Sequence, residues 1–352
     1  MTASVDSQKV IENVANVVKK DIIAIGGSAG SGAVLRQLLR DLPGDLAASV
    51  FVSTHIPAHT PSLLAEVLAG NAAMPVSQAL DGQPIEPGRI YVAAPDRHLL
   101  LMEGTIRLGT GPRENMVRPS IDPLFRSAAL SYGPRVVGVV LTGMLNDGAA
   151  GLTAIKSQGG TAVVQHPLDA EADQMPLAAL ESTDVDHVAP AAKLGELLGT
   201  IAGTDAGSFH SPSEELRLEV EIAAGARLGS EKLRRISIPS ALSCPDCHGV
   251  LSEMNGAGPL RYRCQIGHAY TAENLAAHID EVDEAVRVAM RVMEERVTLV
   301  ERMALDARST GRMAVAELYE KRAEEYRRYA DTLRDAAVTS MRLGRAPREQ
   351  DI

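Results

Sequence analysis

Ser28, His55 and Asp147 are the residues of this sequence whose types and positions could support nucleophilic catalysis. A serine hydroxyl becomes a strong nucleophile when a neutral imidazole takes its proton, and a carboxylate can fix the tautomer of that imidazole. Each of the three residues follows a short apolar segment that predicts a buried strand. Parallel strands end at the same edge of their sheet, so we expect the three side chains to meet there.

The serine lies in Gly-Gly-Ser-Ala-Gly, residues 26–30, between an apolar run at 21–25 and an amphipathic stretch at 34–42. The Gly-x-Ser-x-Gly spacing is typical of a nucleophile elbow, where small neighbours allow a sharp turn from a strand into a helix. A Walker A loop would need Gly-Lys-Ser/Thr, and a dinucleotide-binding loop would need Gly-x-Gly-x-x-Gly with a later acidic residue; neither pattern is present. A glycine-rich turn with an incidental helix-capping serine is the alternative that the motif alone leaves open.

His55 ends the apolar segment 47–54, and Asp147 follows the apolar segment 135–142. A right-handed crossover from the first strand to the second places Ser28 and His55 on the same edge. Taken singly, the histidine could satisfy a strand end and the aspartate could cap a helix. Their common location favours a catalytic group, and its chain order, Ser then His then Asp, differs from that of the α/β-hydrolases.

Alternating strands and helices predict a doubly wound, mostly parallel α/β sheet over residues 21–203. Further strands are expected at 89–95 and 161–165, and helices at 61–70, 122–130, 174–181 and 191–201. Two short β segments, 99–102 and 105–108, predict a hairpin at one edge of this sheet.

Composition excludes several classes of function. The chain has 352 residues, a net charge of -10 and 3% aromatic residues with no Trp, which argues against a nucleic-acid partner. No export signal and no run of about 18 apolar residues is present, so we expect a cytoplasmic protein without membrane insertion. Three cysteines, an odd number, favour a metal or thiol role over a disulfide framework.

The cysteines form the pattern Cys244-x2-Cys247, then 16 residues, then Cys264-x3-His268. Three thiolates and one imidazole are a ligand set that Zn(II) takes in closed structural sites, and this predicts a zinc-ribbon-like element at 241–272. Four protein ligands leave no open position for catalysis. His248 is the alternative fourth ligand, and an element that no longer binds metal is the other possibility.

The remaining chain divides into a breaker-rich linker with a bridging segment, 204–240, and a helical region, 273–345. Residues 216–223 alternate apolar and acidic types, so they could form a strand or a bridging element. Apolar residues three and four apart run through 275–300 and 315–337, with a break at 309–311, which predicts an antiparallel helical hairpin. Partner docking or homodimerisation is the role we expect for it. Residues 1–20 form an N-terminal extension.

Several segments together resemble one family: residues 23–30, 54–57, 88–93, 118–129 and 141–151 are similar to the catalytic domain of the chemotaxis protein-glutamate methylesterases (CheB). The resemblance covers residues 21–203. It implies a carboxylic-ester hydrolase that demethylates glutamyl methyl esters on chemoreceptors, often with glutamine deamidase activity, and that needs no catalytic cofactor. Ser28 would be the nucleophile, His55 the general base and Asp147 its orienter, with backbone amides near Ala29 and Met144 for the oxyanion.

The sequence departs from the family at three points. Ser31 stands where members commonly have a second glycine, and Leu145-Asn146 precedes Asp147 where Gly-x is usual. Only about 20 residues precede the first strand, so we expect no receiver domain and no phosphoryl control in cis. A separate receiver or signalling protein could act through the C-terminal helices. A non-catalytic scaffold that retains the fold, and a small-molecule esterase, are the alternative functions.

Overall fold

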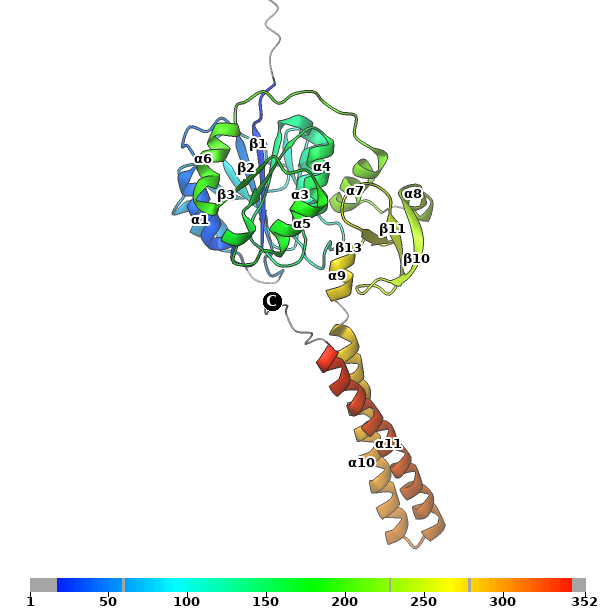
Figure 1. The fold of residues 1–352 in the computed structure, drawn as a ribbon. Coiled ribbons are helices and arrows are strands. Elements are labelled where there is room, and N and C mark those ends of the chain that lie inside the picture. The colour runs from blue at the N-terminus through cyan, green and yellow to red at the C-terminus, as the bar shows by residue number, and fades with distance from the viewer. Residues whose placement is uncertain (1–17, 59–60, 228, 278–279, 344–352) are drawn as a thin grey trace, which may run out of the picture. The chain divides into compact units, whose positions relative to one another are not determined.

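The computed structural model describes residues 18–58, 61–227, 229–277 and 280–343, with the backbone alone described for 280–285, 287 and 336–343. Most of the expected N-terminal extension therefore lies outside the described residues. The chain forms two compact units, Met1–Asn274 and Leu275–Ile352 (Figure 1). Among the described helices, none is both long and apolar enough to cross a membrane.

A seven-stranded sheet forms the centre of the first unit, in the order β3-β4-β2-β1-β7-β8-β9. All of its neighbouring strands pair in parallel, which confirms the predicted doubly wound α/β fold. The strands are β1 (Ile22–Gly27), β2 (Ser49–Thr54), β3 (Val76–Gln78), β4 (Ile90–Val92), β7 (Val136–Val140), β8 (Thr161–Gln165) and β9 (His187–Ala189). The two short edge strands, β3 and β9, were not predicted.

Helices cover both faces of this sheet (Figure 1). Successive residues of a strand point to opposite faces, so Ile22 of β1 packs into one core while Ile23 packs into the other. The first core lies under α3, α4 and α5, and the second under α1 and α6. The helices are α1 (Ser31–Asp41), α2 (Leu64–Ala69), α3 (Ile121–Tyr132), α4 (Ala149–Ser157), α5 (Gln174–Ser182) and α6 (Ala191–Ile201), with 3-10 turns at Gly133–Arg135 and Pro167–Asp169.

The predicted edge hairpin is in a different place. β5 (His98–Met102) and β6 (Thr105–Gly109) pair with each other in a separate two-stranded sheet. Leu99, Leu101 and Ile106 are fully buried in the same core as α3, so the hairpin gains more by covering that core than by extending the sheet.

The rest of the first unit is a four-stranded antiparallel sheet preceded by two helices. We call this sheet with its loops, residues 237–271, the ribbon: β10 (Ser237–Ser243), β11 (Val250–Met254), β12 (Arg261–Cys264) and β13 (Ala269–Thr271). Before it lie α7 (Glu214–Ala224) and α8 (Ser230–Ile236). The strand expectation for 216–223 is wrong: Ser213 caps a helix there, and the acidic Glu219 is buried against arginines of the ribbon.

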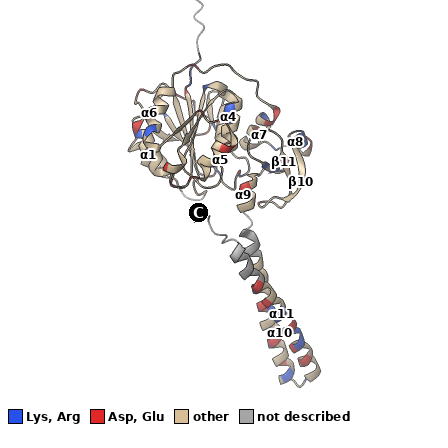
Figure 2. Ribbon diagram, viewed as in Figure 1, with Lys and Arg blue, Asp and Glu red and all other residues tan. Residues whose placement is uncertain are grey.

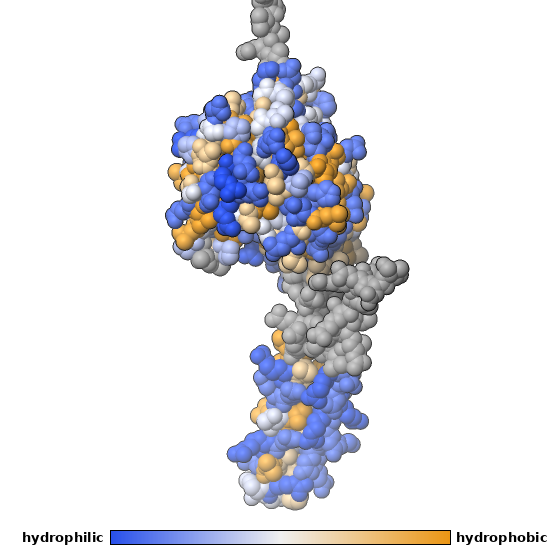
Figure 3. Space-filling model, turned by 60° about the vertical axis from the view of Figure 1, so that its left-hand side comes forward, coloured by the Kyte–Doolittle hydropathy of each residue, from blue (hydrophilic) through white to orange (hydrophobic). Residues whose placement is uncertain are grey.

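The second unit is an antiparallel helical hairpin, as predicted. After the short helix α9 (Ala272–Ala277), α10 (Asp280–Ser309) and α11 (Met313–Leu343) reverse direction at Gly311, whose φ is 76°. Small residues such as Ala307 and Ala323 are buried between the helices. Acidic and basic residues are interspersed along the hairpin (Figure 2), and hydrophobic residues form separate spots on a largely hydrophilic surface (Figure 3). Three residues of the predicted apolar seams, Ile279, Val282 and Ala337, lie outside the described side chains.

Candidate active site

Ser28 lies in the turn from β1 to α1, where the packing requires glycine. A Cβ on Gly26 would lie 2.2 Å from a side-chain carbon of Ile121, and Gly30 has a φ of 76°. Ser31 closes the turn, because its hydroxyl donates to the Ser28 carbonyl at 2.7 Å. The turn therefore has the strand-to-helix form that the Gly-x-Ser-x-Gly spacing predicts.

Three side chains predicted from the sequence form one hydrogen-bonded chain. The Oγ of Ser28 lies 2.9 Å from Nδ1 of His55, and Nε2 of His55 lies 2.8 Å from Oδ2 of Asp147. An ionised carboxylate only accepts, so Nε2 carries the imidazole proton and Nδ1 accepts from the serine hydroxyl. This is the tautomer that a general base at Nδ1 requires.

Asp147 accepts hydrogen bonds from the N-terminus of α3 as well. Its Oδ1 accepts from Ser120 Oγ at 2.8 Å, Asn115 Nδ2 at 3.0 Å and the Asp122 amide at 3.2 Å, and its Oδ2 accepts from the Ile121 amide at 2.8 Å. The helix-cap role considered for this aspartate is therefore real, but it serves α3 and not the helix that follows Asp147. The cap and the contact with the imidazole use the same carboxylate.

Two buried carboxyl groups share this region with different charges. Burial would raise the pKa of Asp147, but the hydrogen bond and charge of His55, with the Ile121 amide and the Ser120 hydroxyl, lower it to about 2. Burial and the neighbouring Asp147 charge raise the pKa of Asp122 to about 7. The pair therefore carries close to one negative charge below neutral pH, and that charge lies on the carboxylate that contacts His55.

Ala29 directly follows Ser28, and Met144 directly follows Gly143. Within the described part of the chain, neither amide donates to another protein group. Gly143 packs directly against the serine, since a Cβ there would lie 2.9 Å from Ser28 Cβ and 2.0 Å from Met175 Sδ. Amides that are close to the nucleophile and free of protein partners are suited to stabilise an oxyanion.

Sequence reasoning missed Asn115 and Asn146 as site residues and treated Ser120 only as the start of a helix. Asn115 lies in a loop without apolar periodicity, and its amide donates to both Asp147 and Asp122. Asn146 appeared only as a departure from the family pattern. Its position next to Asp147 was the one signal in the sequence.

The four predicted metal ligands form a second cluster in the ribbon. One ligand atom from each of Cys244, Cys247, Cys264 and His268 lies within 4.8 Å of the other three, whereas His248 does not belong to the group. Burial and the neighbouring Cys244 raise the pKa of Cys264 to about 12, so this thiol stays protonated without a cation. A bound divalent cation would stabilise the thiolates instead, and this donor set fits a structural metal site.

Comparison with known proteins supports the fold. A family model described as CheB methylesterase matches residues 23–198. The crystal structure of the Thermotoga maritima CheB methylesterase catalytic domain is matched over its full length and over 53% of this chain, with 31% identity and a TM-score of 0.50. A Leptospira interrogans relative is 46% identical over 35% of this chain and 64% of its own length.

A second relative, from Anaeromyxobacter dehalogenans, is named protein-glutamate methylesterase/protein-glutamine glutaminase 2 and is 39% identical over 50% of this chain. The chain spans 52% of that protein, so it matches only part of its relatives' length. The matched region contains Ser28, His55 and Asp147. This chain belongs to the CheB methylesterase family.

Proposed function

We propose that the chain is a serine hydrolase that demethylates glutamyl methyl esters of a chemoreceptor. The observation that carries the proposal is the hydrogen-bonded chain of Ser28, His55 and Asp147 at the carboxyl edge of the sheet. The names of the relatives, protein-glutamate methylesterase/protein-glutamine glutaminase, supply the substrate class. A non-catalytic scaffold would have no need of this arrangement.

In the first half of the reaction, Ser28 Oγ attacks the ester carbonyl while Nδ1 of His55 takes the hydroxyl proton. The carbonyl oxygen becomes an oxyanion, which the amides of Ala29 and Met144 stabilise. The carbon–methoxy bond then breaks, and His55 returns the proton so that methanol leaves. Asp147 holds the imidazole in the Nε2–H tautomer and stabilises the imidazolium that forms.

In the second half, a water molecule attacks the glutamyl-serine ester, and His55 again takes a proton. Breakage of the acyl–serine bond releases the glutamate side chain and restores the serine hydroxyl. The same steps on a glutamine amide would release ammonia in place of methanol, which accounts for deamidation as a second activity.

The other parts of the chain have supporting roles in this proposal. Cys244, Cys247, Cys264 and His268 would hold a structural Zn(II), because the donors are the ones that this cation prefers and no position is left open. The α10–α11 hairpin would dock a signalling partner or a second copy through exposed apolar residues such as Leu299 and Leu318. Metal analysis should give one equivalent of zinc per chain, and Cys247→Ser should lose it.

Methanol release from a methylated receptor, measured beside hydrolysis of a small activated ester, tests the enzyme assignment. Ser28→Ala and His55→Ala should abolish both reactions. Ser157→Ala and His210→Ala are matched controls, because both side chains are exposed and lie outside the hydrogen-bonded chain. Hydrolysis of the small ester without methanol release would indicate a small-molecule esterase, and the absence of both would indicate a scaffold.

A further inference from the structure

The short strand β13 lies between the metal-ligand cluster and the carboxylate of Asp147. It begins directly after His268, and the hydroxyl of Tyr270 lies 3.5 Å from Sγ of Cys244 and donates to Asp246. Its backbone also pairs with the loop before α3, since the backbone N–H group of Asn115 donates to the Ala269 carbonyl at 2.8 Å. Three residues therefore connect a metal ligand to the active-site loop.

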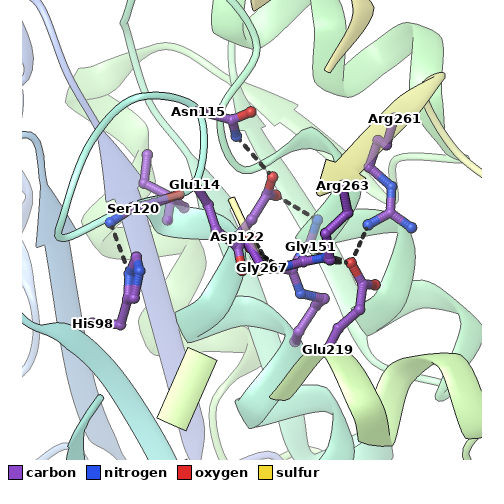
Figure 4. A network of polar contacts seen from close by, with 12 residues as sticks. His98, Glu114, Asn115, Ser120, Asp122, Gly151, Glu219, Arg261, Arg263 and Gly267 are labelled. Carbon is purple, nitrogen blue, oxygen red and sulfur yellow. Dashed lines mark hydrogen bonds and ion pairs between the residues drawn. The ribbon is translucent and has the colours of Figure 1, made fainter. Parts of the chain in front are cut away.

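Thr271, the last residue of β13, fixes the side chain of Asn115. The Thr271 amide donates to Asn115 Oδ1 at 3.2 Å, so Nδ2 must face the opposite way. Nδ2 then donates to Asp147 Oδ1 at 3.0 Å and to Asp122 Oδ2 at 3.1 Å, the second of which is drawn in Figure 4. Reversal of the amide would leave the Thr271 N–H group and Nδ2 of Asn115, both donors, facing each other, and would turn Oδ1 of Asn115 toward the oxygens of Asp147 and Asp122.

The same strand end holds Asn146, the residue before Asp147. Asn146 Oδ1 accepts from Thr271 Oγ1 at 2.6 Å and from Asn274 Nδ2 at 2.7 Å, and its Nδ2 donates to Glu273 Oε2 at 2.6 Å. All three partners come from residues 271–274. The side chain of Asn146, whose position affects the backbone of Asp147, is thus bound entirely by the end of the ribbon and the start of α9.

A buried ionic cluster holds the ribbon against α3 and α7. Arg263 of β12 pairs with Glu219 at 2.9 Å and with Glu114 at 3.2 Å, and its side chain is fully buried. Arg126 of α3 pairs with Glu114. Arg261 pairs with Glu219 at 2.7 Å (Figure 4). Glu114 directly precedes Asn115, so the cluster also fixes the loop that contacts Asp147.

We propose that Asn115 and Asn146 are positioning residues for Asp147 and that the ribbon sets both of them through β13. The ribbon is then a working part of the active site, and the order of its metal-ligand cluster affects the reactivity of Ser28. The inference rests on the proposed function, because Asp147 acts through His55 and Ser28. Catalysis therefore depends on the ribbon, as it would not depend on a separately folded appendage.

The test measures the labelling rate of Ser28 in the full chain with a small serine-directed phosphonate, which needs no receptor substrate. Thr271→Val removes the hydroxyl that contacts Asn146, and we expect labelling to slow by about tenfold or more. Thr271→Ser keeps that hydroxyl and should restore the rate. Ser240→Ala is the matched control, because its hydroxyl donates to the Leu251 carbonyl and accepts from the Leu242 amide, both of which lie within the ribbon.

A second variant separates positioning from general loss of structure. Asn115→Ala removes a donor that stabilises the ionised form of Asp147. The titratable groups next to Asp147 are His55 and Asp122. Because the charge on Asp147 is then less well stabilised by hydrogen bonds, the acid limb of the labelling profile should move to higher pH. A variant that is merely less stable would lower the labelled fraction without moving this limb. Removal of metal with a chelator, checked by metal analysis, should slow labelling, and added Zn(II) should restore it.

The outcomes separate the two proposals. Labelling of Thr271→Val and Asn115→Ala at the wild-type rate, with an unmoved acid limb, would overturn the inference and leave the proposed function in place. A folded wild-type chain in which Ser28 does not react would instead overturn the proposed function and the inference with it. The variants decide the question whether or not the purified chain carries metal.

Discussion

Replacement of Asp147 by asparagine should remove activity by changing the tautomer of His55. Every lone pair of the carboxylate that faces protein meets a donor: Oδ2 faces His55 Nε2 and the Ile121 amide, and Oδ1 faces Asn115, Ser120 and Asp122. An asparagine has one oxygen and one NH2 group. Either the donors that face Oδ1 or the donors that face Oδ2 must therefore meet the NH2 group.

The structure decides which set this is. With NH2 at the Oδ1 position, one N–H group of the Asn115 side chain and the backbone amide of Asp122 would both be left buried and unpaired, at about 1–3 kcal/mol each. With NH2 at the Oδ2 position, only the Ile121 amide is left unpaired, because the imidazole can move its proton to Nδ1. The second orientation is therefore preferred, and Ser28 then faces an N–H group in place of a base. The expected loss in kcat is about 10⁴-fold, as for the equivalent tautomer change in a serine protease triad.

The assay combines phosphonate labelling of Ser28 with the ¹⁵N chemical shifts of the His55 ring. The shifts should report protonated Nε2 in the wild type and protonated Nδ1 in Asp147→Asn. Asp186→Asn is the control, since this aspartate also accepts from a backbone amide, that of Ala162, but lies outside the site. Reactivity within tenfold of the wild type, or an unchanged tautomer in the variant, would refute the reasoning.

Three further predictions concern the surroundings of the site. The pKa of Asp122 is 3.8 for a free side chain and about 7 in the fold, so between these pH values the folded state binds a proton that the unfolded state does not. The free energy of unfolding should therefore fall as pH rises from 3.8 to about 7. Asp122→Asn should remove that dependence in denaturant titrations. Glu219→Gln leaves the buried arginines short of one negative charge and should cost about 3–5 kcal/mol of unfolding free energy, whereas Glu214→Gln, an exposed residue of the same helix, should cost less than about 1 kcal/mol. Gly143→Ala should slow Ser28 labelling at least tenfold, because the added Cβ overlaps Met175 and displaces Ser28; an unchanged rate would show that the loop can shift without cost.

The central sheet and the Ser28–His55–Asp147 group were predictable because their signals are local. Each strand of the sheet interior is an apolar run, and parallel strands deliver the residues that follow them to one edge. The short strands β3 and β9 carry no such signal, since three-residue edge strands are too short to show a period. The sequence of α7 suggested a strand because the buried Glu219 interrupts the helical spacing of its apolar residues. Only the arginine partners of Glu219 explain why this side chain is buried.

The contacts of the ribbon with the active site could not be predicted in the same way. Thr271 and Asn115 are 156 residues apart, and Asn274 and Asn146 are 128 apart. Polar side chains in loops have no periodicity that would indicate such partners. The cysteine spacing predicted a compact element at this point in the chain, but not the surface on which it packs.

The two uses of Asp147 determine which variants report on catalysis alone. Its side chain is 2% exposed and it caps α3, whereas the side chain of His55 is 23% exposed and contacts the fold mainly through Asp147 and Ser28. A charge so deeply buried is stable only because the N-terminus of α3, Ser120 and Asn115 supply donors, and the same donors fix the direction in which Oδ2 faces the imidazole. Loss of Asp147 must therefore disturb α3 and the loop that binds the ribbon, as well as the tautomer of His55. Ser28→Ala removes the nucleophile without touching these contacts, so a comparison of the two variants separates the chemical step from the framework that orients it.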